Sequence, residues 1–456
     1  GILQVRAQIA HFPDDSASWT LLGLLTREAG LHDETVRHLQ HAVLLDPSRH
    51  RAAQHRVFQE FYAPELVPAR VRAVHERWAE TYAAPHYPRT PPAPIRHLAG
   101  RRLRIGYVSP DWKFHPVAKF SECFLRHHDR TRFEVFCYSC TRRVDARTRA
   151  LAHLPEHWVE ATRLTDEELC GQIRHDGIDI LVDLAGHTPG SRALVFARQP
   201  SSVQVSFIGH IGTTGIPTIG YRVTGAFADP PDQGYDAHWT ERLVYLPETA
   251  WCFSAPTDAP PVAPLPGASQ RRITFGSLSH LGKISPATLA TWSRLLHVVS
   301  DSRLLLVRDP LRDREVRARF LRYFVDAGIA PDRIDLRDWP QNQGNRLAAY
   351  HAMDIALDPF PYNGMTTTCD ALHMGVPVVA LAGEIHVARM GVSVLSNVGL
   401  AGPCLACSEN EYIEKAARLA ADRAALAVLR RELRPRMERS PLMNEPQFTR
   451  HLESAF

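Results

Sequence analysis

The chain has 456 residues, which predicts about three domains and excludes a single small domain. Apolar residues make up 45% and charged residues 22%, a composition that excludes a collagen-like or wholly disordered chain. The net charge is only +4, and the basic residues are scattered, so charge does not favour a nucleic-acid partner. We find neither a long apolar run nor a basic region leading into one near Gly1, so we expect a cytoplasmic protein without membrane contact.

The first 90 residues predict a helical repeat. Pro13 with Trp19 recurs as Pro47 with Ala53, an offset of 34 residues that is the tetratricopeptide period. Gly23 would let the two helices of a hairpin pack closely. An unrelated helical hairpin with a fortuitous proline spacing is the alternative. Under either interpretation, the apolar periodicity predicts helices over 16–29, 33–45, 50–60 and 66–82.

Two proline-rich stretches divide the chain. Five prolines fall between Pro85 and Pro94, and a helix cannot continue through them. A second stretch, Pro256 to Pro266, predicts a linker. We therefore predict three parts, namely tetratricopeptide-like helical repeats over 1–90, a Rossmann-like domain over 91–260, and a second Rossmann-like domain with C-terminal helices over 261–456.

Short β-branched runs alternate with amphipathic segments in both later parts, which predicts parallel α/β sheets. Strands are predicted over 103–109, 133–139, 178–184, 203–209, 243–247, 273–277, 303–308, 354–358 and 377–381. Helices are predicted near 166–175, from Pro286, over 311–327 and near 366–374. Two such domains would form a cleft at the carboxyl ends of their strands, where folds of this type bind ligands.

The densest cluster of polar and glycine residues is LDPFPYNGMTTTCDALHMGVPVV at 357–379. Thr366, Thr367 and Thr368 open a predicted helix directly after a buried strand. The backbone N–H groups at that N-terminus and the neighbouring hydroxyls would bind phosphate oxygens. Asp370, one turn further, would accept hydrogen bonds from sugar hydroxyls. The alternative is that the threonines only cap the helix.

Lys283 is one of four lysines in the chain and follows the strand 273–277 within SHLGKISPATL. Ser285 and Pro286 predict the start of the next helix. A lysine between this strand and this helix would neutralise a diphosphate as it leaves. A solvated cation on a loop is the alternative.

Two histidines follow strands of the first α/β part. His115 follows the strand 103–109 in YVSPDWKFHPVAKF, where it could be a base, a hydrogen-bond donor or a metal ligand. His187 follows the strand 178–184 in LVDLAGHTPG, and its alternative is a loop-tip residue. The chain has 24 histidines, so the pattern alone leaves both roles as hypotheses.

Two C-x-x-C pairs have the ligand count of a zinc site, Cys137 with Cys140 and Cys404 with Cys407. They lie about 260 residues apart, and the first pair ends a buried strand, so reduced thiols in a cytosolic core explain them better. We predict no metal site.

Five motifs in order resemble the O-linked N-acetylglucosamine transferase family, glycosyltransferase family 41: HPVAKF after YVSPD, DLAGHTPGSR, QVSFIGHIGTTG, FGSLSHLGKISP and DPFPYNGMTTTCDALHMGVPVV. The chain looks like a bacterial member over about residues 1–435. The resemblance implies a GT-B architecture, in which two Rossmann-like domains follow a tetratricopeptide superhelix and the domain over 261–456 binds a nucleotide sugar. It also implies inverting transfer of N-acetylglucosamine from UDP-GlcNAc to Ser or Thr hydroxyls, without a metal ion or other cofactor. Acceptor proteins would bind along the repeats and in the cleft.

The resemblance also implies roles for individual residues. His115 matches a histidine proposed as base or acceptor-site residue, and Lys283 matches the lysine that contacts the diphosphate. Arg346 lies near the loop that contacts the nucleotide base, within RDWPQNQGNR. The implied catalytic residues are therefore His115 and Lys283, and the implied donor-binding residues are Lys283, His187, Arg346, Thr366, Thr367 and Asp370.

Three positions depart from the animal members of the family. Met365 stands in place of a histidine, His187 in place of a tyrosine, and His280 in place of a glutamine. A second family histidine has no clean match near residues 174–175. These departures leave the donor sugar open, and the nearest alternative is protein O-fucosylation from GDP-fucose, as in plant relatives. A catalytically weak, nucleotide-binding repeat scaffold is the alternative from a different class.

Overall fold

The computed structural model describes residues 1–90, 92, 100–269, 272–339 and 346–456. The chain forms two compact units. Unit 1 consists of Gly1–Asp46, Phe61–Leu66 and Ala255–Met443, and unit 2 of Pro47–Glu60, Val67–Ser254 and Asn444–Phe456. The chain passes from unit 2 to unit 1 at the start of the second proline-rich stretch. The predicted boundaries near 90 and 260 stay predictions. No helix in these ranges is long and apolar enough to cross a membrane.

Unit 2 is built on a sheet of seven parallel strands in the order β3-β2-β1-β4-β5-β6-β7. The strands are β1 Leu103–Ser109, β2 Phe133–Ser139, β3 His157–Glu160, β4 Ile180–Asp183, β5 Val203–Ser206, β6 Tyr221–Gly225 and β7 Arg242–Leu246. The strand order grows outward in both directions from β1. The connections therefore reverse direction between β1 and β4, which is the Rossmann pattern that was predicted.

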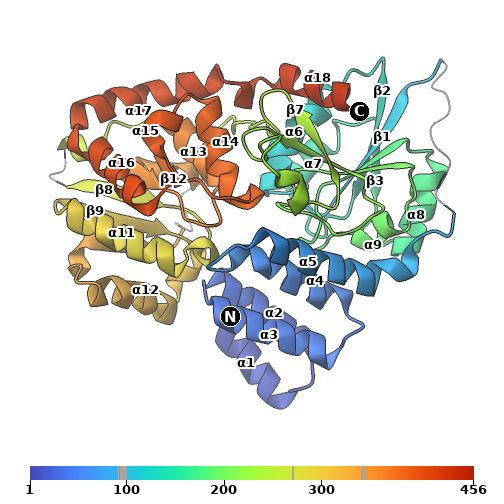
Figure 1. Cartoon of the computed structure of the whole chain (residues 1–456), viewed down its shortest axis with the longest axis horizontal. Helices are drawn as coiled ribbons and strands as arrows, with labels where there is room; N and C mark the ends of the chain where they lie inside the picture. Colours follow the sequence, from blue (N-terminus) through green and yellow to red (C-terminus); the bar gives the residue numbers. More distant parts are fainter. Residues whose placement is uncertain (91, 93–99, 270–271, 340–345) are drawn as a thin grey trace. The chain divides into compact units, whose positions relative to one another are not determined.

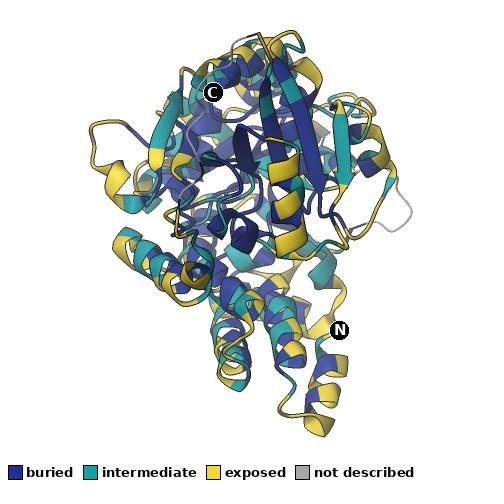
Figure 2. Cartoon of the chain, turned by 90° about the vertical axis from the view of Figure 1, so that its right-hand side faces the viewer, coloured by how far each residue is buried: buried dark blue, intermediate teal, exposed yellow. Residues whose placement is uncertain are grey.

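Unit 2 also contains the helices α4 His50–Phe58, α5 Pro68–Trp78, α6 Pro116–His127, α7 Ala146–Leu151, α8 Asp166–His175, α9 Ala193–Ala197 and α18 Glu445–Ala455. Of these, α6, α7 and α18 contribute side chains to the core of the sheet. The core includes Ile105, Tyr107, Phe124, Val135 and Phe207. Figure 2 shows the strands largely in the dark blue of buried residues, whereas the helices are striped by one buried and one exposed face.

Unit 1 carries a second sheet of six parallel strands, in the order β10-β9-β8-β11-β12-β13. They are β8 Ile273–Ser277, β9 Ser302–Val307, β10 Ile334–Arg337, β11 Ile355–Leu357, β12 Val378–Leu381 and β13 Leu405–Ala406. The helices of this α/β part are α10 Pro266–Ser269, α11 Pro286–Val298, α12 Arg314–Asp326, α13 Thr366–His373, α14 Met390–Asn397, α15 Ala401–Cys404, α16 Glu409–Ala421 and α17 Arg423–Glu438 (Figure 1). In this sheet, the direction in which successive strands are added reverses between β8 and β11.

The N-terminal helices of unit 1 confirm the predicted hairpin. They are α1 Ile2–His11, α2 Ser16–Glu28 and α3 His32–Leu45, and Figure 1 draws α2 and α3 side by side. A Cβ atom on Gly23 of α2 would lie 2.7 Å from the Leu39 side chain of α3, so a larger residue there would displace Leu39. In unit 2, the predicted helices over 50–60 and 66–82 end earlier, because α4 continues as a 3-10 turn over Gln59–Tyr62 and α5 as a π-helical turn over Ala79–Ala83.

All nine predicted strands are present, but two are three residues shorter than predicted. The strand predicted over 178–184 spans only Ile180–Asp183. The strand predicted over 203–209 ends at Ser206, because Ile208 has a positive φ of 29° and turns the chain away. A Cβ atom on the next residue, Gly209, would lie 1.6 Å from the carbonyl oxygen of Leu184, so the turn requires glycine. The strands β3, β6, β10 and β13 were not predicted. Three of them are short edge strands, and β6 contains the buried polar residues Arg222 and Thr224.

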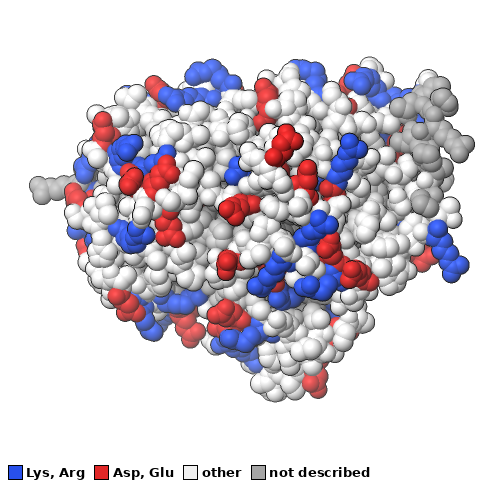
Figure 3. Space-filling view, in the orientation of Figure 1, with Lys and Arg blue, Asp and Glu red and all other residues white. Residues whose placement is uncertain are grey.

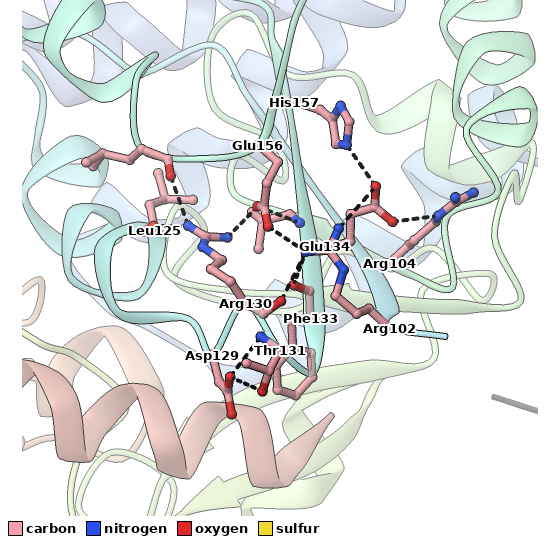
Figure 4. Close-up of polar contacts among 12 residues, drawn as sticks. Arg102, Arg104, Leu125, Asp129, Arg130, Thr131, Phe133, Glu134, Glu156 and His157 are labelled. Atoms are coloured by element: carbon pink, nitrogen blue, oxygen red, sulfur yellow. Dashed lines mark hydrogen bonds and ion pairs between the residues drawn. The ribbon is translucent and has the colours of Figure 1, made fainter. Parts of the chain in front are cut away.

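Charged side chains of both signs are interspersed on the face drawn in Figure 3. A network of charged side chains lies near the amino ends of β1, β2 and β3 (Figure 4). Glu134 accepts hydrogen bonds from Arg104 at 3.0 Å and from His157 at 2.9 Å. Glu156 accepts from Arg102 at 2.9 Å and from Arg130 at 2.8 Å. Because Arg104 and Glu134 are register partners, the network favours the observed alignment of β1 with β2.

Three imidazoles meet inside unit 2, and each is 0% exposed: His75 of α5, His187 after β4 and His210 after β5. Their ring centroids lie 5.1, 5.3 and 5.5 Å apart. One nitrogen of each ring bonds to a backbone carbonyl, of Val71, Thr214 and Thr213 respectively, at 2.6, 2.7 and 3.0 Å. Burial lowers the pKa of His75 to about 3 and of His187 to about 4, and it also lowers the pKa of His210 well below the ordinary value.

These buried imidazoles predict a loss of stability in mild acid. The unfolded histidines bind protons near pH 6.5, whereas the folded ones stay neutral, so stability present above pH 6.5 falls as the pH decreases toward 4. Each such histidine contributes about 1 kcal/mol per pH unit. Urea unfolding at pH 7, 6 and 5 gives the free energy of unfolding at each pH. This free energy is expected to fall less steeply with decreasing pH for His187→Gln than for the exposed control His153→Gln. Equal slopes for the two variants would contradict the prediction.

Candidate active site

In unit 1, two loops meet at the carboxyl ends of β8 and β11, the neighbouring strands between which the strand order reverses. One loop follows β8 and carries Lys283, and the other follows β11 and leads into α13. The Lys283 ammonium donates a hydrogen bond to the carbonyl oxygen of Asn363 at 2.9 Å, which joins the two loops. Because ligands of doubly wound sheets bind at the carboxyl ends of the strands at such a reversal, this is the candidate ligand site of unit 1.

The half-buried Lys283 ammonium has an incomplete set of partners for its charge. Its nitrogen lies 3.8 Å from the centre of the Tyr362 ring. Burial lowers the pKa of Lys283, while the nearby Asp358 acts in the opposite direction. Burial likewise raises the pKa of Asp358, whose Oδ1 accepts from the Gly364 N–H at 2.7 Å and whose Oδ2 accepts no hydrogen bond from the described residues. An anionic ligand here would therefore favour the charged form of Lys283.

The first turn of α13 presents unused backbone donors. The helix starts at Thr366, and the side chain of the preceding Met365 makes no capping hydrogen bond. The N–H groups of Thr366, Thr367 and Thr368 lie in the first turn, where the helix offers no carbonyl acceptor. The Thr368 hydroxyl donates back to the Gly364 carbonyl at 3.0 Å. The threonines occupy helical positions and not the N-cap, so capping does not explain them.

Residues from both loops line a narrow pocket beside this first turn. The Thr367 hydroxyl lies 3.5 Å from the Ser279 hydroxyl, and the Thr367 carbonyl accepts from the Tyr350 hydroxyl at 2.9 Å. Asp370 is half-buried one turn along α13, and its charge contributes to the raised pKa of Tyr350 after the larger effect of burial. Lys283, Thr367 and Asp370 therefore all lie around the reversal point of one sheet.

The N-terminal helices hold the loop that carries Lys283. Glu28, the last residue of α2, accepts a hydrogen bond from Nε2 of His280 at 2.8 Å. The other His280 nitrogen, Nδ1, accepts from the Gly282 N–H at 3.0 Å, which places the proton on Nε2. The Tyr62 ring packs against His280 and Tyr362, with centroid separations of 5.6 and 5.0 Å. Sequence patterns could not reveal these contacts, because they join distant segments.

Arg346 is 70% exposed and lies 3.8 Å from Asp309 and 5.2 Å from the centre of the Trp339 ring. The neighbouring residues 340–345 of the predicted base-contacting loop lie outside the described residues. Sequence analysis missed Arg308, which directly follows β9 at the same sheet edge. Burial lowers the pKa of Arg308, and the charge of Arg346 acts in the same direction. Its position at a strand carboxyl end was the signal that could have identified it.

In unit 2, His115 is the N-cap residue of α6 and follows β1, next to the reversal point of that sheet. Its Nδ1 accepts from the Val117 N–H at 3.3 Å and lies 3.8 Å from an Asp111 oxygen. The side chain is 37% exposed. Burial lowers the pKa of His115, Asp111 raises it, and Lys113 lowers it. A neutral ring with its proton on Nε2 fits these contacts, so the free nitrogen is a hydrogen-bond donor.

His187 lies in the buried imidazole cluster and not at a loop tip. The loop before it folds inward, because Asp183 accepts hydrogen bonds from the Ala185 and Gly186 N–H groups, both at 2.9 Å. Burial raises the pKa of Asp183 to about 6. The other five residues predicted to bind the donor all lie in unit 1. The donor-binding role of His187 stays a prediction.

The cysteines form no disulfide. All eight are free, and seven are buried. Cys137 and Cys140 belong to unit 2, whereas Cys404 and Cys407 belong to unit 1. Within the described ranges, no three His, Cys, Asp or Glu side chains are arranged to hold a metal ion.

Residues 86–254 and 265–452 match the family model described as glycosyl transferase family 41. The chain belongs to glycosyl transferase family 41. The break between the two matched stretches falls in the second proline-rich stretch. Membership confirms the resemblance carried by the five motifs.

The relatives in family 41 include plant and animal proteins. A rice protein named as a probable UDP-N-acetylglucosamine-peptide N-acetylglucosaminyltransferase, SPINDLY, is 39% identical over 90% of this chain and 44% of its own length. A UDP-N-acetylglucosamine-peptide N-acetylglucosaminyltransferase of Caenorhabditis elegans is 25% identical over 78% of this chain and 40% of its own length. The chain thus spans less than half the length of these curated relatives.

Solved structures agree on the fold of this family 41 member. A lysine-to-methionine mutant of the O-GlcNAc transferase of Thermobaculum terrenum matches with a TM-score of 0.94 and 36% identity, over 100% of this chain and 86% of that chain. A glycosyltransferase of Rickettsia africae matches with a TM-score of 0.51 and 12% identity, over 78% of this chain and 98% of that chain, a likeness of fold alone. With two parallel Rossmann-type sheets, the chain has the predicted GT-B fold.

The contacts of His115 predict its tautomer and the direction of its titration. Nitrogen-detected NMR at pH 7 is expected to show a protonated Nε2 and an unprotonated Nδ1, with a pKa below the ordinary 6.5. Asp111→Asn removes a charge that stabilises the imidazolium and is expected to lower the pKa further. Lys113→Gln, the matched control, is expected to raise it. A ring protonated at Nδ1 in the intact protein would contradict the assignment.

Proposed function

We propose that this chain transfers N-acetylglucosamine from UDP-GlcNAc to Ser or Thr hydroxyls of acceptor proteins, with inversion and without a metal ion or cofactor. The observation that carries the proposal is the meeting of the Lys283 ammonium with the uncapped first turn of α13 at one reversal point. Family membership and the names of the rice and Thermobaculum relatives support it. The predicted alternatives do not account better for a half-buried lysine at this place.

In the proposed reaction, the glycosidic C–O bond breaks and negative charge develops on the departing diphosphate. Lys283 supplies a positive charge, and the N–H groups of Thr366 and Thr367 supply donors aligned with the helix dipole. A diphosphate would raise the depressed pKa of Lys283 and keep it charged. Asp370 would accept hydrogen bonds from the ribose hydroxyls, and Arg346 would lie toward the nucleotide base.

The acceptor hydroxyl would attack the anomeric carbon from the face opposite the diphosphate, which inverts the configuration. His115 is proposed as an acceptor-side residue that donates a hydrogen bond from Nε2. Its Nδ1 is already occupied by the Val117 N–H, so the ring orients a ligand through a proton and does not present a free basic nitrogen. This choice selects the acceptor-site role among the two that the family resemblance implied.

We also propose that the N-terminal helices are tetratricopeptide-type repeats that bind the acceptor polypeptide. The tight α2–α3 hairpin and the 34-residue offset support this. Eight free thiols fit a reducing compartment, so we place the protein in the cytoplasm, in a bacterium as the motifs suggest. No nucleic acid or membrane is part of the proposed function.

Lys283→Met is expected to abolish stabilisation by donor nucleotides and to lower the transfer rate at least a hundredfold, because no other lysine lies at this point. Thermal shift measurements with UDP, UDP-GlcNAc, GDP and GDP-fucose in EDTA test the donor. Lys415→Met is the matched control. Lys415 forms an ion pair with Glu411 and a hydrogen bond to the Gly402 carbonyl, so this variant should retain the shift.

Each outcome of this panel is decisive. Stabilisation by uridine ligands in EDTA that is lost only in Lys283→Met supports the proposed donor and the absence of a metal requirement for binding. A preference for guanine ligands moves the assignment to the fucosyl alternative. Stabilisation by a nucleotide without any sugar transfer favours the nucleotide-binding scaffold. No shift with any of the four nucleotides contradicts both the proposed donor site and that scaffold.

Glu28→Ala is expected to weaken UDP binding about three- to tenfold, because it removes the acceptor that fixes His280 beside Lys283. Titration calorimetry measures the Kd. Glu34→Ala, which breaks an exposed ion pair with Arg6 on the same helices, is the control and should bind UDP normally. Equal affinities of the two variants would show that α2 does not support the donor site.

A further inference from the structure

A second pocket lies at the carboxyl edge of the sheet in unit 2. Its volume is about 130 Å³. This is enough for a carboxylate or phosphate with a few waters, and it is below the roughly 300–1,000 Å³ of sites for whole small molecules. The lining residues come from α4, from the loops after β2, β3 and β4 and from the start of α8, and include Arg51, Cys140, Arg142, Thr165, Asp166 and Arg192.

Arg192 forms the fixed wall of the pocket. Its side chain is 8% exposed. Its Nε donates to Asp166 at 2.6 Å, and its terminal nitrogens donate to the carbonyls of Ala161 and Leu164 at 3.1 and 2.8 Å. The charge of Arg192 is therefore neutralised by Asp166, and its donors are occupied.

Arg51 and Arg142 are different. Both are exposed, and neither guanidinium has a hydrogen bond or ion pair with any described residue. Two positive charges thus border a polar pocket without a carboxylate of their own. The planar, multiply donating guanidinium suits bidentate contact with carboxylates and phosphates.

The pocket adjoins the loop that carries His115. The Phe114 N–H donates to Asp145 at 2.8 Å, which ties that loop to the segment after β2 that contains Arg142. Gly190 also lines the pocket, and a Cβ atom there would lie 3.0 Å from Pro110 on the same loop. Arg142 therefore lies on a segment that is tied to the loop of the proposed acceptor-side histidine, and Arg51 lines the same pocket from α4.

We propose that this pocket binds an acidic side chain of the acceptor polypeptide, a carboxylate or a phosphate close in sequence to the hydroxyl that receives the sugar. The inference rests on the proposed function, since it assigns the polypeptide as the acceptor. It adds a specificity determinant, because a neutral side chain would leave both guanidinium groups without a partner.

The test uses the full chain with synthetic peptides that have one central serine. Asp, Asn, Lys or phosphoserine is placed at one flanking position at a time, and transfer is measured as kcat/KM. At one or two positions, the intact protein is expected to favour Asp over Asn about tenfold. Arg142→Gln and Arg51→Gln are expected to bring this ratio close to one. Arg143→Gln, an exposed neighbour outside the pocket, is expected to keep it.

Further arms identify the ligand class. A phosphoserine preference larger than the Asp preference assigns a phosphate, and equal preferences assign any acidic group. The UDP-induced thermal shift monitors whether each variant is folded. The proposal is overturned if the intact protein prefers Asp over Asn at no position, or if the Asp/Asn ratio of kcat/KM is equal in Arg142→Gln and Arg143→Gln. It is also overturned if a single-stranded oligonucleotide competes with the peptides and this competition depends on Arg142.

Failure of the proposed function is recognised separately. If the intact protein transfers no sugar to any peptide, anisotropy of fluorescently labelled Asp and Asn peptides still measures binding to the pocket. Tighter binding of the Asp peptide, lost in Arg142→Gln and kept in Arg143→Gln, supports the pocket without transfer. Equal binding of the two peptides rejects it.

Discussion

The constraint on which the site depends is the uniform direction of the strands in each sheet. Parallel strands joined by crossovers end at one edge, and the connections on either side of the first strand run in opposite directions. In unit 1, this separates the loop after β8 from the loop after β11 and leaves room between their helices. A lysine from one loop and an uncapped helix start from the other can then face the same ligand without further adjustment of the backbone.

The electrostatics of that place follow from burial. Asp358 is buried and Lys283 is half-buried, and neither has a complete set of partners among the described residues. Such a pair is costly to hold in a protein without a ligand, and it resembles an active site more than a structural ion pair. The same contrast separates Arg192 from Arg51 and Arg142 in unit 2, since only the first has its charge matched by a neighbour.

The sequence predicted much of the fold because apolar runs record burial directly. Continuous β-branched runs located nine strands, and Ser285 with Pro286 located the start of α11. Prediction from the sequence failed where a strand buries polar side chains, as at Arg222 in β6. Its guanidinium donates hydrogen bonds to the Ser206 hydroxyl and to the His210 carbonyl. The contacts of Glu28 and Tyr62 with the Lys283 loop could not be predicted either, because no local pattern specifies which distant loop a helix end will meet.

The contact between α2 and the Lys283 loop also limits how this chain can be recombined. Helices at the start of a chain are often treated as an exchangeable module, to be replaced by another domain in a chimera. Glu28 and Tyr62, however, belong to the surroundings of His280 and Lys283 within unit 1. A chimera that keeps only the two α/β parts would lose the Glu28 and Tyr62 contacts around His280 and Lys283. A working fusion point therefore has to lie upstream of α2.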